Sequence, residues 1–174
     1  MSKSVLNSNK PLSVGLIGLG NMGQNHLRVL SSLASIDVKW IFDIDEEKSK
    51  KLAQSYETQS INNLDTALAS VEAAIICTPS VCHYDDLNRV SKYVERVFIE
   101  KPLTSDLGSS QKALELIRSK KLKVQVGFIE RFNPVVRELQ KILTSSGRTI
   151  NIDFTRTNRL SSRIKDVDVV TDLM

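Results

Sequence analysis

The chain has 174 residues, of which 41% are hydrophobic and 25% charged, and it carries a net charge of +4 at neutral pH. This composition excludes an intrinsically disordered chain, a collagen-like repeat and a small disulfide-rich scaffold. No apolar run approaches the roughly 20 residues that span a bilayer, and residues 1–10 lack the apolar core of a signal peptide. We therefore expect a cytoplasmic globular protein that has a flexible tail over 1–10 and does not bind membranes.

Neither the charge nor the cysteines indicate a nucleic-acid or metal partner. Most basic residues alternate with acidic ones, as in residues 45–51, which is typical of solvent-exposed helix faces. The exception is a basic stretch over 156–165. Nucleic-acid binding through that stretch is the least favoured of our functional hypotheses. Cys77 and Cys82 lack CxxC spacing, so we expect reduced thiols and no metal site.

Short β-rich runs alternate with amphipathic segments between residues 12 and 127. Strands are predicted over 13–19, 37–42, 59–61, 73–77, 96–99 and 124–127. Helices are predicted between them, over 22–33, 46–56, 64–69, 84–93 and 109–119. The first and fourth strands are apolar at almost every position, which is typical of strands buried on both faces. This alternation predicts an α/β fold, a doubly wound parallel sheet with helices on both faces.

The pattern changes after Gly127. Asn133 and Pro134 predict the start of a helix over 133–144, with Asn as N-cap and Pro in the first turn. Residues 149–156 alternate between apolar and polar, which predicts a half-buried antiparallel strand. We therefore divide the chain into a first domain over 11–128 and, over 129–174, a linker helix with the start of an incomplete second domain. The predicted strand would expose an unpaired edge, so we expect self-association through it.

A glycine-rich turn joins the first predicted strand to the first helix. Gly18, Gly20 and Gly23 form a GxGxxG pattern at this junction. In dinucleotide-binding proteins the first glycine allows the tight turn, the second lets the pyrophosphate approach the backbone, and the third lets the helix pack closely. The phosphates would lie at the helix N-terminus, where we count Asn21 and Met22 among the cofactor-binding residues.

Asp43 follows the second predicted strand, 20 residues after Gly23. An acid there would accept hydrogen bonds from the adenosine ribose hydroxyls, and its charge would repel the 2′-phosphate of NADP. The alternative is that the glycines merely form a tight turn and Asp43 caps the next helix. Because the glycines and the acid occur together in a strand–turn–helix context, we predict dinucleotide binding, with NAD favoured over NADP.

Two further turns follow predicted strands whose carboxyl ends would border the ligand. The turn after the fourth strand contains Thr78-Pro79 and leads to His83, which either contacts the cofactor or begins a helix. The turn after the fifth contains Glu100-Lys101-Pro102, where a lysine could share a proton with a substrate hydroxyl, although a surface lysine is the usual interpretation. Pro102 would stiffen that turn, with a cis bond as one option. We assign His26 a structural role. The cofactor-binding residues expected in these turns are Thr78, Pro79, His83, Glu100 and Lys101.

Taken together, these segments resemble the Gfo/Idh/MocA family of NAD(P)-dependent oxidoreductases. The resemblance rests on residues 15–27, Asp43, 75–83, 100–102 and 126–134, in the family's order and spacing, and residues 163–174 look like the lead-in to its second-domain catalytic segment. It implies a Rossmann fold for the first domain. It further implies that residues 129–174 begin an α+β domain with an open antiparallel sheet, with the cofactor crevice between the two domains.

The resemblance also implies an activity. Members of the family transfer a hydride between the nicotinamide and a hydroxyl or carbonyl carbon of sugars, inositols or sugar nucleotides. Lys101 matches the family's active-site lysine, and Asp172 matches the aspartate four residues before its acid/base histidine. Residues 130–134 and the basic stretch over 156–165 are most similar to the branch that acts on nucleotide-linked amino sugars. Arginines there could pair with a diphosphate. The candidates here are Arg131, Arg156 and Arg163, and the alternative for the basic stretch is a solvated loop.

The chain departs from the family in its histidines. Its two histidines, His26 and His83, both lie in the first predicted domain, so no residue matches the family's catalytic histidine. We therefore expect a chain that carries mainly the nucleotide-binding part of an NAD-dependent oxidoreductase for a small sugar-type substrate, and we leave its turnover open. The alternative is a non-catalytic or vestigial NAD-binding module. The substrate, the direction of reaction and the oligomer size do not follow from these residues.

Overall fold

Six parallel strands form one sheet in the order β3-β2-β1-β4-β5-β6. The computed structural model describes residues 10–145, 147–148, 151, 153 and 155. The strands are β1 (Leu12–Ile17), β2 (Ile36–Phe42), β3 (Gln59–Ser60), β4 (Ala73–Ile76), β5 (Arg96–Ile99) and β6 (Lys123–Val126). The α-helices are α1 (Asn21–Leu30), α2 (Glu46–Ser55), α3 (Leu64–Leu68), α4 (His83–Val90), α5 (Leu107–Lys120) and α6 (Pro134–Ser145). Two 3₁₀ turns complete the elements, η1 (Ser80–Cys82) and η2 (Ile129–Phe132).

The prediction of a doubly wound parallel sheet is confirmed. Each strand and helix predicted between residues 12 and 127 is present, with ends that differ by at most three residues. The largest differences are at the ends of α1 and α4, which stop before residues 33 and 93. There the chain continues in turns whose N–H groups bond three residues back, as from Leu33 to Leu30 and from Tyr93 to Val90. The apolar pattern therefore continues beyond the α-helical bonding.

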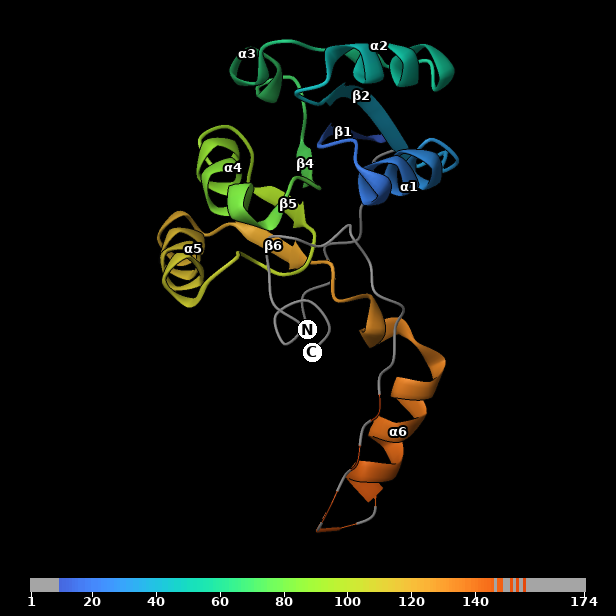
Figure 1. Cartoon of the computed structure of the whole chain (residues 1–174), viewed down its shortest axis with the longest axis vertical. Coiled ribbons are helices and arrows are strands. Elements are labelled where there is room, and N and C mark those ends of the chain that lie inside the picture. Colours follow the sequence, from blue (N-terminus) through green and yellow to red (C-terminus); the bar gives the residue numbers. More distant parts are fainter. Residues whose placement is uncertain (1–9, 146, 149–150, 152, 154, 156–174) are drawn as a thin grey trace.

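The expected second domain falls mainly outside the described residues. Of the strand predicted over 149–156, the structure describes Asn151, Asp153 and Thr155, and none of these is in a strand. The predicted helix over 133–144 is present as α6. Figure 1 shows α6 extending away from the sheet, and no residue of α6 is buried.

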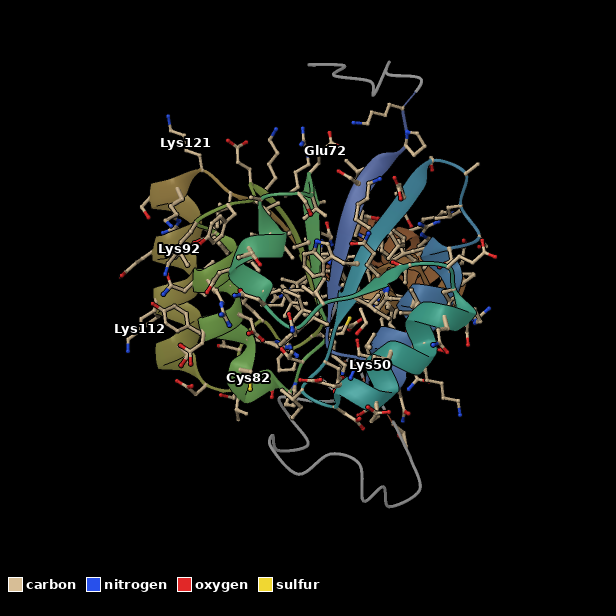
Figure 2. The ribbon with its side chains drawn as sticks, turned by 90° about the horizontal axis from the view of Figure 1, so that it is seen from above. Lys50, Glu72, Cys82, Lys92, Lys112 and Lys121 are labelled. Carbon is tan, nitrogen blue, oxygen red and sulfur yellow. The ribbon has the colours of Figure 1, made fainter. Side chains whose placement is uncertain are left out.

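Helices cover both faces of the sheet, and each face has its own apolar core. Figure 2 shows α1 and α2 on one side of the strands, with α4 and α5 on the other. The core toward α1 and α2 consists of Val14, Leu16, Leu19, Leu27, Ile41, Ala53 and Ile75. The core toward α3, α4 and α5 is larger and includes Ile17, Trp40, Leu64, Leu68, Ile76, Leu87, Val90, Ile99 and Ala113. Because β1 contributes to both cores, its run of apolar residues is explained by burial on two faces.

Trp40 joins β2 to the larger core. Its ring lies against Gly15 of β1, where an added Cβ would come within 2.1 Å of the ring. Its Nε1 donates a hydrogen bond to the carbonyl oxygen of Ala67 at 3.1 Å. The same side chain therefore contacts both β1 and α3.

We expect Trp40→Ala to lower the free energy of unfolding by about 3–5 kcal/mol, because it removes a fully buried ring and leaves a cavity. Trp40 is the only tryptophan, so the measurement is urea unfolding followed by far-UV circular dichroism. Leu33→Ala, at a side chain that is 44% exposed, is the control and should change the value by no more than about 0.5 kcal/mol. Equal effects of the two substitutions would contradict this account of the core.

Candidate functional site

The strand order reverses between β1 and β4, and the turns that follow the strands meet at one edge of the sheet there. Open α/β sheets bind their ligands at this kind of position. Figure 2 shows Cys82 and Lys50 toward this edge, opposite Glu72 and Lys121. The turns after β1, β2, β4 and β5 contain most of the residues that we selected from the sequence.

The three glycines of the turn after β1 have the geometry that their proposed roles require. Gly18 has φ +88°, and an added Cβ would lie 2.7 Å from the backbone of Cys77 and Thr78. At Gly23 an added Cβ would lie 1.9 Å from the carbonyl oxygen of Gly18. At Gly20, by contrast, an added Cβ would meet no atom within 4 Å. The turn is therefore tightly packed at Gly18 and Gly23 and open at Gly20. An open position is what a ligand needs to come close to the backbone.

The N-terminus of α1 is free of side-chain caps. Its N-cap, Gly20, makes no side-chain hydrogen bond, and no acidic residue lies in the first turn. The caps of α2 and α5 differ, because the side chains of Asp45 and Asp106 accept hydrogen bonds from backbone N–H groups there. Asn21 and Met22 are exposed. The first N–H groups of α1 can therefore donate hydrogen bonds to an anion such as a pyrophosphate.

Asp43 lies at the end of β2, where its carboxylate is held by three donors. Its Oδ2 accepts the N–H of Leu19 at 2.6 Å, and its Oδ1 accepts the N–H of Asp45 at 2.9 Å and lies 3.0 Å from Lys48 Nζ. Burial alone would raise the pKa of Asp43, but the hydrogen bonds from Asp45, Leu19 and Lys48 together lower it below its ordinary value. Asp43 is therefore ionised at neutral pH and connects the end of β2 to the glycine turn.

The alternative in which Asp43 caps the next helix is wrong. The cap of α2 is Asp45, whose side chain accepts the backbone N–H of Lys48 at 3.0 Å. Asp43 accepts the N–H of Asp45 and thereby supports this cap from outside the helix.

His83 connects the turn after β4 to the turn after β5. Its ring is 1% exposed, with Nδ1 2.8 Å from the carbonyl oxygen of Pro102 and Nε2 2.9 Å from that of Thr78. A side chain buried in this way reaches no ligand unless the turns separate. The structure therefore agrees with the alternative in which His83 begins a helix, here α4. The Thr78 hydroxyl donates to Asp86 at 2.6 Å, and burial raises the pKa of Asp86. Pro79 is exposed at the edge of the site.

Glu100 faces protein groups. It is 7% exposed, with Oε1 2.7 Å from His26 Nε2 and Oε2 accepting the N–H of Lys101 at 3.1 Å. An added Cβ at Gly127 would lie 2.8 Å from Oε2, so the backbone just after β6 also packs against this carboxylate. We expected Glu100 to bind the cofactor, but its described contacts position the following lysine and attach α1 to β5. His26 has the structural role that we assigned to it, and the peptide bond between Lys101 and Pro102 is cis.

The thiols and the remaining ionisable groups provide no further centre within the described residues. Burial raises the pKa of Cys77, so its thiol stays protonated and unreactive. Cys82 is exposed, and neither cysteine forms a disulfide. Among the described residues no group of three or more His, Cys, Asp or Glu side chains is placed to hold a metal ion. In the same part of the chain no helix is long and apolar enough to cross a membrane.

The substrate candidates are not brought together in the described part of the chain. Arg131 lies in η2, with its guanidinium carbon 5.8 Å from the centroid of the Phe128 ring. Arg156, Arg163 and Asp172 lie outside the described residues.

Comparison with known proteins identifies the family. The family described as "Oxidoreductase family, NAD-binding Rossmann fold" matches residues 12–128. An inositol 2-dehydrogenase of Rhizobium meliloti is 29% identical over 74% of this chain and 39% of that protein. A UDP-N-acetylglucosamine 3-dehydrogenase of Acidithiobacillus ferrooxidans is 24% identical over 94% of this chain and 51% of that protein. The chain spans about half the length of the curated relatives it matches.

A solved structure supports the same fold. The scyllo-inositol dehydrogenase of Lactobacillus casei, with bound NAD(H) and scyllo-inositol, matches with a TM-score of 0.72 at 21% identity. The match covers 78% of this chain and 41% of that one. Because the family match extends over β1 to β6 and includes the glycine turn and Asp43, the chain belongs to the Gfo/Idh/MocA oxidoreductase family and carries its NAD-binding Rossmann domain.

Proposed function

We propose that this chain forms the nucleotide-binding part of a dehydrogenase that moves a hydride between NAD and a sugar-type substrate. The observation that carries the proposal is the open, uncapped glycine turn beside an ionised Asp43. The reacting carbon would bear a hydroxyl or carbonyl in a sugar, an inositol or a nucleotide-linked sugar, by analogy with relatives that act on inositol and UDP-N-acetylglucosamine. The proposed setting is the cytoplasm.

The residues present fit NAD at this edge of the sheet. Residues 18–23 would hold the pyrophosphate through backbone N–H groups, and the Asp43 carboxylate would accept hydrogen bonds from the adenosine ribose. Thr78 and Pro79 border the same turn, because Gly18 packs against the backbone that leads into them. When bound, NAD supplies the hydride acceptor or donor.

Lys101 is the proposed catalytic residue within the described chain. Its backbone N–H is held by the Glu100 carboxylate, and its peptide bond to Pro102 is cis. Its ammonium group would stabilise negative charge on the substrate oxygen and exchange a proton with it as the carbon is oxidised or reduced. Asp172 would assist, and Arg131, Arg156 and Arg163 would pair with a substrate diphosphate. The proposed boundary between the nucleotide-binding and substrate-binding parts is near residue 128.

A non-catalytic NAD-binding module is the second candidate function, because the described residues bring the cofactor candidates together but not the substrate candidates. The two candidates differ in turnover. Formation of NADH from NAD with inositols or UDP-linked sugars would support the dehydrogenase, whereas NADH binding without any turnover would support the module.

The first prediction from this proposal concerns Asp43. Titration calorimetry of the chain with NADH should show saturable binding, and Asp43→Ala should weaken it about 10- to 150-fold, because a hydrogen bond to a charged acceptor contributes about 1.5–3 kcal/mol. Asp37→Ala, near the opposite end of β2 with a side chain 42% exposed, is the matched control and should bind as the unaltered chain does. Circular dichroism of each variant checks that the fold is retained. Binding of neither NADH nor NADPH to the unaltered chain would refute the proposal.

The second prediction concerns the positioning role of Glu100. Glu100→Ala should lower the free energy of unfolding by about 1–3 kcal/mol, because it leaves the partly buried N–H of Lys101 and the ring of His26 without their acceptor. Glu100→Gln keeps one acceptor oxygen and should lower the free energy of unfolding by less. Glu95→Ala, an exposed acid just before β5, is the control in urea unfolding. A Glu100→Ala variant as stable as the control would show that the described contacts do not hold the turn.

The third prediction concerns self-association, which we propose for this chain. The supporting observation is that η2 and α6 expose apolar side chains, among them Phe132 at 65% and Val135 at 74%. Sedimentation velocity at micromolar concentration should show species heavier than the 19.5 kDa chain, and Val135→Asp should shift the distribution toward the monomer. A single 19.5 kDa species for the unaltered chain would rule the proposal out.

A further inference from the structure

Lys48 lies directly beside the carboxylate that would receive the adenosine ribose. It is the third residue of α2, and the Asp45 cap fixes its backbone N–H. From there its side chain returns to the end of β2, where Nζ lies 3.0 Å from Asp43 Oδ1. The Lys48 side chain is 34% exposed and that of Asp43 9%. The Lys48 side chain is therefore the more exposed member of this ion pair.

The acceptor capacity of Asp43 is nearly used in this arrangement. An ionised carboxylate has about four lone-pair positions. Three of them are occupied by the N–H groups of Leu19 and Asp45 and by Lys48. A ribose with free 2′- and 3′-hydroxyls would bring two donors, so both can bond only if one present donor leaves. The two backbone N–H groups are fixed, whereas the lysine is a partly exposed charge on a flexible stem. Lys48 is thus the donor that can move.

A 2′-phosphate would meet the same ammonium group. The 3′-hydroxyl of NADP can donate to Asp43 Oδ1, and its oxygen would then lie within about 6 Å of Lys48 Nζ, since both contacts are about 3 Å long. The 2′-phosphate on the adjacent ribose carbon only accepts hydrogen bonds, so its partner would be the ammonium group and not the carboxylate. The neighbouring acids of α2, Glu46 and Glu47, are 64% and 90% exposed and lie 3.3 and 3.5 Å from Lys50. They have their own cation, which leaves Lys48 as the counter-charge for Asp43 and for a group bound beside it.

We propose that Lys48 sets how strongly this site distinguishes NADP from NAD. With NAD, Lys48 moves off Asp43 and gives up its acceptor position to the ribose hydroxyls. With NADP, the same ammonium group pairs with the 2′-phosphate and offsets its repulsion by Asp43. The site therefore accepts both dinucleotides, and the side chain at position 48 determines the ratio of their affinities. This inference rests on the proposed function, because it assumes that the dinucleotide binds at this edge of the sheet.

The test is a pair of binding titrations, with NADH and with NADPH, on the unaltered chain and on variants of α2. Lys48→Ala should leave NADH binding equal or tighter, because a competing donor is removed. It should weaken NADPH about tenfold, because a charge-assisted contact is lost. Lys48→Arg retains the charge and should retain the ratio of the two dissociation constants. Lys50→Ala is the matched control on the same helix, since Lys50 is 56% exposed and labelled on α2 in Figure 2.

The outcomes of these titrations distinguish the role of Lys48 from the proposed function itself. The inference is supported if the ratio of the NADPH dissociation constant to the NADH dissociation constant rises in Lys48→Ala and does not rise in Lys48→Arg or Lys50→Ala. If NADH binds the unaltered chain and Lys48→Ala leaves the ratio within a factor of about two, the inference is wrong while the proposed function stands. If NADH binding is lost only in Lys48→Ala, then Lys48 orients Asp43 and does not select between the cofactors. If neither dinucleotide binds the unaltered chain, the proposed function and this inference both fail.

Discussion

The close packing of the glycine turn against β4 is the constraint on which the rest of the site depends. Gly18 and Gly23 have no space for a side chain, because Cys77, Thr78 and the turn's own backbone occupy it. This packing brings the N-terminus of α1 to the point where the strand order reverses. Without it, the free N–H groups of α1 and the turn after β4 would not border the same space. A ligand can then approach the turn's backbone from the open side of Gly20.

Polar side chains hold the other turns in place around this packing. Asp43 binds the N–H of Leu19 and so attaches the end of β2 to the glycine turn. His83 joins the turns after β4 and β5, and Glu100 joins β5 to α1. Each of these side chains bridges two different elements and is largely buried. The positions of the proposed ligand-binding groups are therefore set by residues that need not touch the ligand.

The sequence predicts the sheet well because burial on both faces leaves a strong apolar pattern in β1 and β4. It also predicts the glycine turn and Asp43, whose roles depend on local spacing. The partners of His83 and Glu100 could not be predicted, because Pro102 and His26 lie 19 and 74 residues away and only the fold brings them near. The one hint in the sequence was that His26 and His83 have no metal-ligand spacing, which favours structural roles for both. The cap of α2 was ambiguous for a simpler reason, since Asp43 and Asp45 are two residues apart and both precede the helix.

The charges at this edge of the sheet suit an anionic ligand even though several carboxylates lie there. Asp43 is paired with Lys48 and two backbone N–H groups, and Glu100 is hydrogen-bonded to His26 and to the N–H of Lys101. Burial raises the pKa of Asp86, which favours its neutral form. The first turn of α1 carries no acid, so the partial positive charge of its N-terminus is not offset within the helix. A pyrophosphate at Gly20 would therefore meet a positive helix end and no unpaired carboxylate among the described groups of these turns.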